Sequence, residues 1–234
     1  MNATRTAILI SGRGSNMVAL IEAAAEAGFP AEIVGVISDQ PAAPGLALAA
    51  QRGIPVQAIA RRDFADKAAH DAAIDSALGA LGAEIVANAG YMRLLTPAFV
   101  GKWQGRMINI HPALLPAFRG LDTHRRALEA GVKLHGCTVH FVTAEVDSGP
   151  IIAQAAVPVL AGDTEQELAA RVLKQEHQLY PLALRLVADG RVHMRKGRAV
   201  FELGAGAERA SASLLAPDLR PSTPNLEDLA RFTP

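Results

Sequence analysis

The sequence of 234 residues has a single cysteine, few aromatic residues and no excess of either charge. Cys137 alone excludes an internal disulfide, and its neighbours Gly136 and Thr138 offer neither a metal site nor a redox partner. We therefore expect a reducing, cytoplasmic setting with Cys137 as a buried packing residue. Basic and acidic residues balance at 23 each, so no net field attracts nucleic acid or an anionic membrane.

Long hydrophobic runs are also missing. No run of about 18 apolar residues occurs, which predicts no membrane-spanning helix. The apolar residues 7–10 are too few for a secretory signal. Half of the residues are hydrophobic and 20% are charged, as in ordinary globular enzymes. We expect one α/β domain over residues 1–203 and a poorly ordered tail over residues 204–234, which are rich in alanine, serine and proline.

Short β-type runs alternate with alanine-rich helical stretches in the first half of the chain. The predicted strands are residues 7–10, 33–37, 56–59, 84–89 and 107–110. The predicted helices are residues 15–27, 44–53 and 63–81, with a short one that begins at Thr96-Pro97. This alternation predicts a doubly wound, mostly parallel central sheet with helices on both faces.

The second half of the chain changes character. Strands are expected at residues 138–142 and 151–157, joined by a loop. The capping box of residues 164–167 predicts the start of a long helix that runs towards residue 189. Two short β-type runs within residues 192–201 flank a Lys-Gly turn, which predicts a terminal hairpin.

Residues 11–16, Ser-Gly-Arg-Gly-Ser-Asn, lie where the first strand leads into the first helix. Glycines let the backbone approach a ligand and a helix N-terminus presents free N–H groups, so a phosphate monoester is the natural guest. The alternative is a tight turn in which Ser15 or Asn16 caps the helix. A dinucleotide fingerprint needs a small residue where this chain has Met17, which disfavours NAD even though Asp39 follows the second strand.

Asn109 and His111 stand two residues apart at the end of a predicted strand. Their side chains therefore project from the same face at the carboxyl end, where open α/β sheets bind ligands. An asparagine and a histidine provide donors for a developing oxyanion, and the histidine also supplies a proton. Pro112 and Pro116 hold the chain extended as it leaves the sheet. A hydrogen-bonded structural histidine is the alternative.

Asp147 precedes Ser-Gly-Pro in the loop between the two later strands. An acidic residue in this position commonly forms a turn by bonding to its own backbone. If the loop folds over the end of the sheet, Asp147 instead pairs with His111, favours the imidazolium and raises the pKa of His111.

Together these clusters resemble the glycinamide ribonucleotide formyltransferases of purine synthesis, in their monofunctional bacterial form. The resemblance runs from residue 7 to about residue 201, through residues 11–16, 89–95, 109–116, 120–124, 135–142 and 146–152. Folate-dependent formyltransferases share the Asn-x-His and Asp-x-Gly-Pro pair, whereas the loop at residues 11–16 narrows the acceptor to the ribonucleotide. The resemblance implies a Rossmann-like formyltransferase fold with a C-terminal helix and hairpin.

The resemblance also implies transfer of the formyl group of 10-formyltetrahydrofolate to the amino group of 5'-phosphoribosylglycinamide, without a metal. The catalytic residues would be Asn109, His111 and Asp147. The residues for phosphoribosylglycinamide would be Gly14, Ser15, Asn16, Pro112 and Glu176. The residues for folate would be Lys67, Met92, Arg93, Leu94, Leu95, Asn109, Val142, Thr143, Ala144, Glu145, Val146 and Asp147. For Glu176 and Lys67 the alternative is a solvated helical side chain.

Two positions depart from the family pattern. Asn88 stands where family members commonly have an apolar residue, and Arg13 replaces a smaller polar residue in the phosphate loop. The expected partners are small-molecule substrates, with no nucleic acid and no membrane, and a homodimer is left open.

Three rival functions follow from the same residues. Formyltetrahydrofolate hydrolase shares the catalytic trio but passes the formyl group to water. Methionyl-tRNA formyltransferase is less suited, because it needs a second, basic domain. A nucleotide-binding module without catalysis would not require the trio at all.

Overall fold

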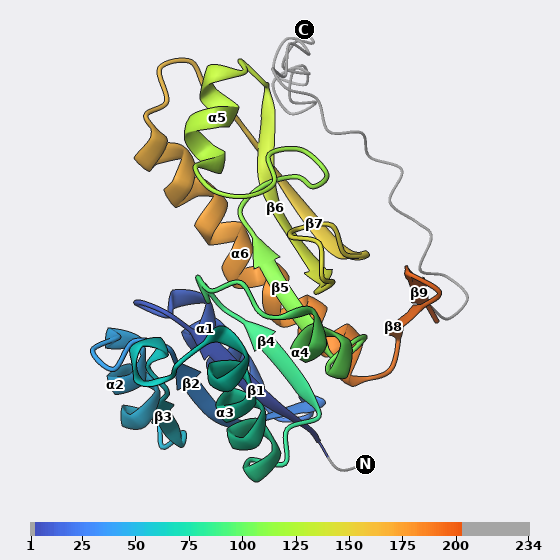
Figure 1. The fold of residues 1–234 in the computed structure, drawn as a ribbon. Coiled ribbons are helices and arrows are strands. Elements are labelled where there is room, and N and C mark those ends of the chain that lie inside the picture. Colours follow the sequence, from blue (N-terminus) through green and yellow to red (C-terminus); the bar gives the residue numbers. More distant parts are fainter. Residues whose placement is uncertain (1–2, 203–234) are drawn as a thin grey trace, which may run out of the picture.

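The computed structural model describes residues 3–202, which form a seven-stranded sheet with helices on both faces and a two-stranded hairpin (Figure 1). The strands are β1 (Thr4–Ile10), β2 (Ala31–Ser38), β3 (Val56–Ala58), β4 (Ile85–Asn88), β5 (Met107–His111), β6 (Leu134–Phe141), β7 (Ile151–Pro158), β8 (Val192–Arg195) and β9 (Arg198–Phe201). The helices are α1 (Ser15–Ala24), α2 (Pro44–Gln51), the 3-10 turn η1 (Arg61–Asp63), α3 (Lys67–Ala80), α4 (Pro97–Lys102), α5 (Thr123–Glu129) and α6 (Glu165–Ala188). The predicted tail at residues 204–234 lies outside the described residues.

The strand order of the large sheet is β3-β2-β1-β4-β5-β6-β7. The strands from β3 to β5 are mutually parallel, whereas β6 and β7 join as antiparallel neighbours. The predicted mostly parallel, doubly wound sheet and the terminal hairpin are therefore confirmed. The chain reverses its winding direction between β1 and β4, and ligands of such sheets bind outside the carboxyl ends of the strands at this point.

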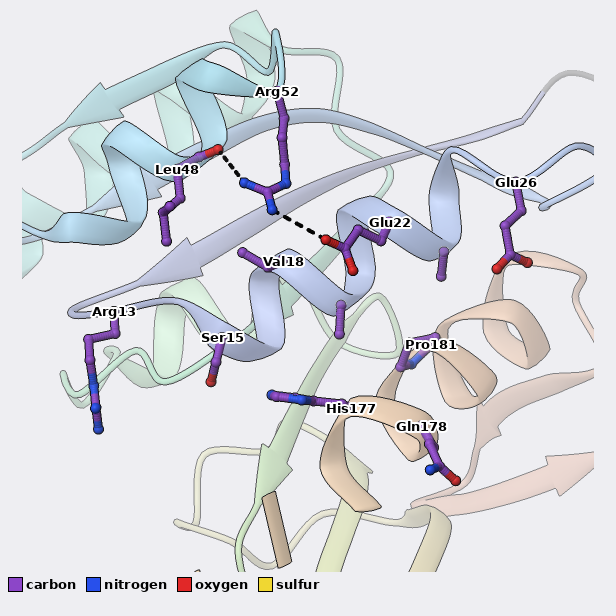
Figure 2. Close-up of a pocket in the computed structure, with 12 residues that line it drawn as sticks. Arg13, Ser15, Val18, Glu22, Glu26, Leu48, Arg52, His177, Gln178 and Pro181 are labelled. Carbon is purple, nitrogen blue, oxygen red and sulfur yellow. Dashed lines mark hydrogen bonds and ion pairs between the residues drawn. The ribbon is translucent and has the colours of Figure 1, made fainter. Parts of the chain in front are cut away.

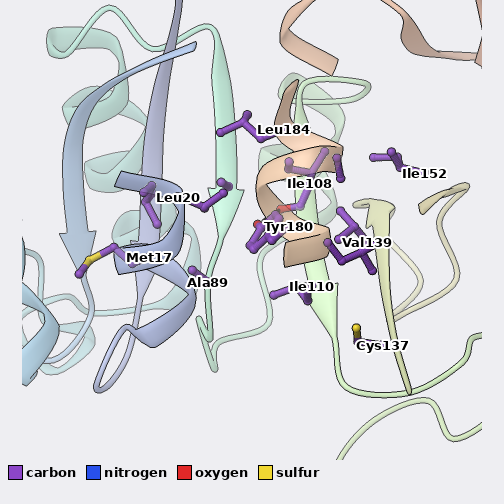
Figure 3. Close-up of a cluster of buried hydrophobic side chains, with 14 of the residues drawn as sticks. Met17, Leu20, Ala89, Ile108, Ile110, Cys137, Val139, Ile152, Tyr180 and Leu184 are labelled. Carbon is purple, nitrogen blue, oxygen red and sulfur yellow. Dashed lines mark hydrogen bonds between the residues drawn. The ribbon is translucent and has the colours of Figure 1, made fainter. Parts of the chain in front are cut away.

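Alternating side chains divide the core into two layers. Ile8 and Ile10 of β1 pack with α1 and α6 on one face, while Ala7 and Leu9 pack with α3 and α4 on the other. Figure 3 shows the first layer, which holds Met17 and Leu20 from α1, Tyr180 and Leu184 from α6, and strand residues including Ile108, Val139 and Cys137. Cys137 is fully buried, as predicted.

Several boundaries differ from the sequence-based prediction. Helix α1 ends at Ala24, not at residue 27, and Gly28 with φ of 79° follows it. Helix α3 begins at Lys67 and not at residue 63, because the Asp66 side chain accepts a hydrogen bond from Ala69 N and caps the helix there. Strand β6 begins at Leu134 and not at residue 138, and the short helix α5 was not predicted.

Helix α6 fixes the strands that carry the candidate site. Its predicted capping box is present, since Thr164 and Glu167 exchange side-chain and backbone hydrogen bonds. Further along α6, the buried Tyr180 hydroxyl donates to the carbonyl oxygens of Asn88, at 2.9 Å, and Ile108, at 3.3 Å. These contacts hold the end of β4 against β5, from the face opposite Asn109 and His111.

Candidate active site

Asn109 and His111 project from the same face of β5, as predicted from their spacing. Ile108, which precedes Asn109, and Ile110, which lies between the two polar residues, pack into the α1–α6 layer. Asn109 and His111 therefore lie on the opposite face. His111 is 5% exposed and Asn109 is half-buried. The strand therefore presents an amide and an imidazole side by side at the carboxyl edge of the sheet.

Asp147 joins this pair through the loop between β6 and β7. Its Oδ2 lies 3.3 Å from His111 Nδ1 and accepts a hydrogen bond of 2.9 Å from Gly120 N. Asp147 has a φ of 49°, a backbone conformation that asparagine and aspartate tolerate better than most residues. The loop folds over the sheet, so the conditional prediction of an Asp147–His111 contact is confirmed.

Gly149 is the reason that this loop can lie so close to the sheet. A Cβ atom at this position would lie 1.7 Å from the Phe141 carbonyl oxygen, far inside contact distance. Only glycine therefore permits the observed approach of the loop to β6.

His140 belongs to the cluster, and sequence reasoning missed it. Asn109 is paired with His140 across β5 and β6, and its Nδ2 lies 3.2 Å from His140 Nε2. The other ring nitrogen of His140 lies 2.9 Å from the Phe141 carbonyl oxygen, and Nε2 is 3.7 Å from Asp147 Oδ1. The sequence spacing of Thr138 and His140 places both on one face of β6. This spacing identifies His140 as a neighbour of Asn109 only once the register of β5 with β6 is known.

Burial and charge act in opposite directions on this cluster. Burial lowers the pKa of His111. This effect is larger than those of the Phe118 carbonyl and the Asp147 carboxylate, which raise the same pKa, so the net pKa lies below its ordinary value. The predicted raised pKa of His111 is therefore wrong, because desolvation of the charged ring exceeds the effect of Asp147. For Asp147, burial raises the pKa, but contacts with His140, Gly120 N–H and His111 lower it to a net value below the ordinary range.

Both ring nitrogens of His111 face oxygen atoms of the protein. Nε2 lies 3.0 Å from the Phe118 carbonyl and Nδ1 lies 3.3 Å from Asp147. A neutral imidazole has one N–H group and satisfies only one of these contacts, whereas an imidazolium satisfies both. His111 can donate to a substrate oxygen only by exchanging one of these partners.

The loop at residues 11–16 leaves the first turn of α1 open. Gly14, with a φ of 73°, is the N-cap residue, and no side chain caps the helix. The alternative in which Ser15 or Asn16 caps the helix is therefore wrong, because both residues lie inside the first turn. The first N–H groups of a helix have no intrahelical partner, so this end presents donors for an anion.

Asn16 and Glu176 meet beneath this helix end. Asn16 Nδ2 donates to Glu176 Oε2 at 2.6 Å, which links α1 to α6. Glu176 is 7% exposed, so it is not a solvated helical acid, and burial raises its pKa while the Asn16 contact lowers it. The predicted phosphate loop and Glu176 are thus brought together.

A groove of about 670 Å³ runs along the outer face of α1 from this loop (Figure 2). Arg13 and Ser15 lie at its loop end, and His177 reaches from α6 towards the first turn of α1. Arg52 closes the α2 side through its bond of 3.2 Å to Glu22. The groove therefore continues from the predicted phosphate site.

The predicted folate residues lie on two loops at the catalytic face. Met92, Leu94 and Val146 are 66%, 65% and 49% exposed, which is unusual for side chains of this size. Leu95 and Val142 pack together against the layer formed by α3 and α4. The remaining predicted loop residues are Arg93, Thr143, Ala144 and Glu145.

Ionic contacts hold both loops in place. Glu145 accepts from Arg119 at 3.2 Å, which ties the loop of Asp147 to the segment after β5. Arg93 Nε donates at 2.8 Å to Asp39, which also accepts from Ser11 at 2.5 Å. Asp39 is thus engaged within the protein and is not a free ribose-binding acid.

Lys67 and Pro112 lie at the margins of the site. Lys67 is the first residue of α3, one turn before Asp71, which accepts a hydrogen bond of 2.7 Å from Thr96 N at the end of the Met92–Leu95 loop. Lys67 therefore shares a helix face with a residue that contacts this loop. Pro112 directly follows His111 where the chain leaves β5.

A metal-binding cluster and a membrane-spanning helix are both absent from the described residues. Residues 3–202 contain no group of three or more histidine, cysteine, aspartate or glutamate side chains placed to hold a metal ion. None of the described helices is long and apolar enough to cross a membrane.

Comparison with known proteins identifies the family of this chain. The model of the formyl transferase family matches residues 4–184. Phosphoribosylglycinamide formyltransferase from Escherichia coli is 45% identical over 192 residues, which cover 82% of this chain and 91% of that protein. The trifunctional purine biosynthetic protein adenosine-3 from Bos taurus is 50% identical over 190 residues, or 81% of this chain, which spans only 19% of that longer protein.

A solved structure agrees with these relatives. Phosphoribosylglycinamide formyltransferase from Brucella melitensis is 60% identical, with a TM-score of 0.78 over 80% of this chain and 96% of that chain. The chain therefore belongs to the formyl transferase family, as a relative of its phosphoribosylglycinamide formyltransferases.

Proposed function

We propose that this protein transfers the formyl group of 10-formyltetrahydrofolate to the amino group of 5'-phosphoribosylglycinamide, a step of purine synthesis. The observation that carries the proposal is the contact of Asp147 with His111, beside Asn109, at the carboxyl edge of the sheet. The similarity to phosphoribosylglycinamide formyltransferases supports the same reaction.

The phosphate end of the acceptor is assigned to Gly14, Ser15 and Asn16. The uncapped start of α1 offers backbone donors and a partial positive charge, which suit a phosphate dianion. Glu176, held by Asn16, accepts hydrogen bonds from hydroxyl groups next to that phosphate. Since β1 and β5 are separated only by β4, an extended acceptor reaches from this loop past Pro112 to His111.

The folate co-substrate, which carries the formyl group, is assigned to the opposite side of the same edge. Exposed Met92, Leu94 and Val146 provide apolar cover for a flat ring. Backbone groups of the two loops provide polar contacts to its edge, and Lys67 provides positive charge for its acidic tail. Arg93, paired with Asp39, holds the loop that carries Met92 and Leu94.

Asn109, His111 and Asp147 divide the chemistry among them. The Asn109 amide donates to the formyl oxygen as it becomes negative during attack by the acceptor amine. His111 exchanges its contact with the Phe118 carbonyl for the same oxygen, and Asp147 stabilises the imidazolium and helps move the amine proton to the departing folate nitrogen. One such donor is worth about 3–4 kcal/mol in the transition state.

The remaining assignments rest on this activity. The partners are small molecules, the reaction needs no metal, and the place of action is the cytoplasm. Assembly as a homodimer is tested by light scattering of the purified chain.

A steady-state assay tests the proposed function. Purified protein, 10-formyl-5,8-dideazafolate and phosphoribosylglycinamide are mixed in the presence of EDTA, and release of the deformylated folate is followed by absorbance. We expect turnover that requires the acceptor, with glycinamide riboside lacking the phosphate as a poor substitute. Equal folate turnover without any acceptor would identify a hydrolase, and no turnover at all would leave only a binding module.

A further inference from the structure

Asn88 is the last residue of β4 and the in-register neighbour of Asn109 on β5 and of Leu9 on β1. Its flanking residues Ala87 and Ala89 pack into the α1–α6 layer, so the Asn88 side chain lies on the other face. Asn88, Asn109 and His111 thus occupy the same face of the sheet at its carboxyl edge.

The side-chain oxygen of Asn88 has no hydrogen-bond partner among the described residues, although Asn88 is only 7% exposed and Oδ1 itself is buried. A buried carbonyl oxygen without a hydrogen-bond partner destabilises the folded protein, whereas an apolar residue of the same size would not. The Tyr180 hydroxyl donates to the backbone carbonyl oxygen of Asn88, so this end of β4 is fixed in place. The missing partner of the side-chain oxygen therefore does not come from a frayed strand end. No described residue supplies the missing hydrogen bond, so a bound ligand is the candidate partner.

We propose that Asn88 recognises the bicyclic ring of the folate co-substrate, by hydrogen bonding of its amide to a polar edge of that ring. This inference rests on the proposed function and adds a residue to the pocket. The pyrimidine half of this ring is planar and carries N–H and C=O groups along its edge, which match the donor and acceptor atoms of an amide. The amide would lie one strand away from Asn109, next to the formyl group that Asn109 contacts.

The position of Asn88 favours folate over the phosphorylated acceptor. Asn16 and Glu176, assigned to the acceptor, lie on α1 and α6 and hence on the other side of the sheet. Asn88 instead shares its face with Val142 and Leu95, whose loops carry the exposed apolar side chains Met92, Leu94 and Val146. A polar group beneath an apolar rim is typical of small-molecule pockets, where a few polar groups fix the orientation of the ligand.

Replacement by an apolar residue of similar size tests the assignment. Asn88→Leu should weaken binding of tetrahydrofolate, measured by anaerobic calorimetry, about 3- to 10-fold, and raise KM for the formyl donor by the same factor. KM for phosphoribosylglycinamide should not change, and the melting temperature should stay the same or rise, because a buried oxygen without a partner is removed. Asn88→Ala, which also lacks the amide but adds no bulk, should show the same loss of folate binding if the leucine does not fit.

Thr6→Val is the matched control, a polar-to-apolar change at a fully buried position near the amino end of β1. It should leave both binding constants unchanged. Wild-type folate affinity in Asn88→Leu and Asn88→Ala, or equal weakening of both substrates, would overturn the proposal and make Asn88 a packing irregularity. Absence of folate binding in the wild-type protein would instead contradict the proposed function itself.

Discussion

Replacing Gly149 with alanine should disable the active site while leaving the fold intact. The new Cβ would lie 1.7 Å from the Phe141 carbonyl oxygen and 2.8 Å from its carbon, whereas real Cβ contacts are essentially never shorter than 3.0 Å. The distance between the new Cβ and the Phe141 oxygen must therefore grow from 1.7 Å to at least 3.0 Å, so the loop and β6 must move apart by at least 1.3 Å. Asp147, two residues away, would move with the loop and lose its contact of 3.3 Å to His111.

A misplacement of about 1 Å in a catalytic group costs on the order of 100-fold in rate. We therefore expect kcat of Gly149→Ala to fall about 100-fold, measured in the formyl transfer assay, and the far-ultraviolet circular dichroism to stay unchanged.

The control is Gly79→Ala, because Gly79 of α3 is exposed and a new Cβ there would meet nothing within 4 Å apart from its chain neighbours and the backbone of its own helix. This change should keep the wild-type kcat and stabilise the protein by about 1 kcal/mol, since alanine favours a helix over glycine. A Gly149→Ala protein with wild-type kcat would refute the claim that the loop positions Asp147 for catalysis.

Three further substitutions test the assigned roles. His111→Ala should lower kcat about 100-fold with little change in either KM, and a large rise in KM alone would contradict a role in the transition state. Asp147→Asn should move the alkaline fall in activity to lower pH. The Asp147 carboxylate raises the pKa of His111 against the effect of burial, and activity that needs the imidazolium is lost as pH rises through that pKa. An unchanged pH–rate profile would exclude this coupling. Glu176→Gln should raise KM for phosphoribosylglycinamide about 10-fold without changing KM for folate, and an unchanged KM would remove Glu176 from the acceptor site.

The sequence was sufficient for the features that depend on local patterns. Apolar runs and helix signals predicted the alternating strands and helices, and Thr164 with Glu167 identified the start of α6. Side-chain alternation alone placed Asn109 and His111 on one face of β5. These predictions succeeded because each depends on residues that are close in the sequence.

Features that depend on tertiary contacts were not predictable in the same way. His140 became part of the site only through the register of β5 with β6, which no local pattern specifies. The direction of the His111 pKa depends on burial by several loops, so considering Asp147 alone gave the wrong sign. The unpaired oxygen of Asn88 likewise appears only when its neighbours on β1 and β5 are known.

The most direct test of the central claim is the fate of the formyl carbon in a single turnover. 10-formyltetrahydrofolate labelled with carbon-13 in the formyl group is mixed with excess enzyme and phosphoribosylglycinamide, and the product is observed by carbon NMR. The arrangement of Asn109, His111 and Asp147 predicts one label per folate in the formamide of the phosphoribosyl product. Label in free formate, or label retained on folate, would contradict formyl transfer at this site.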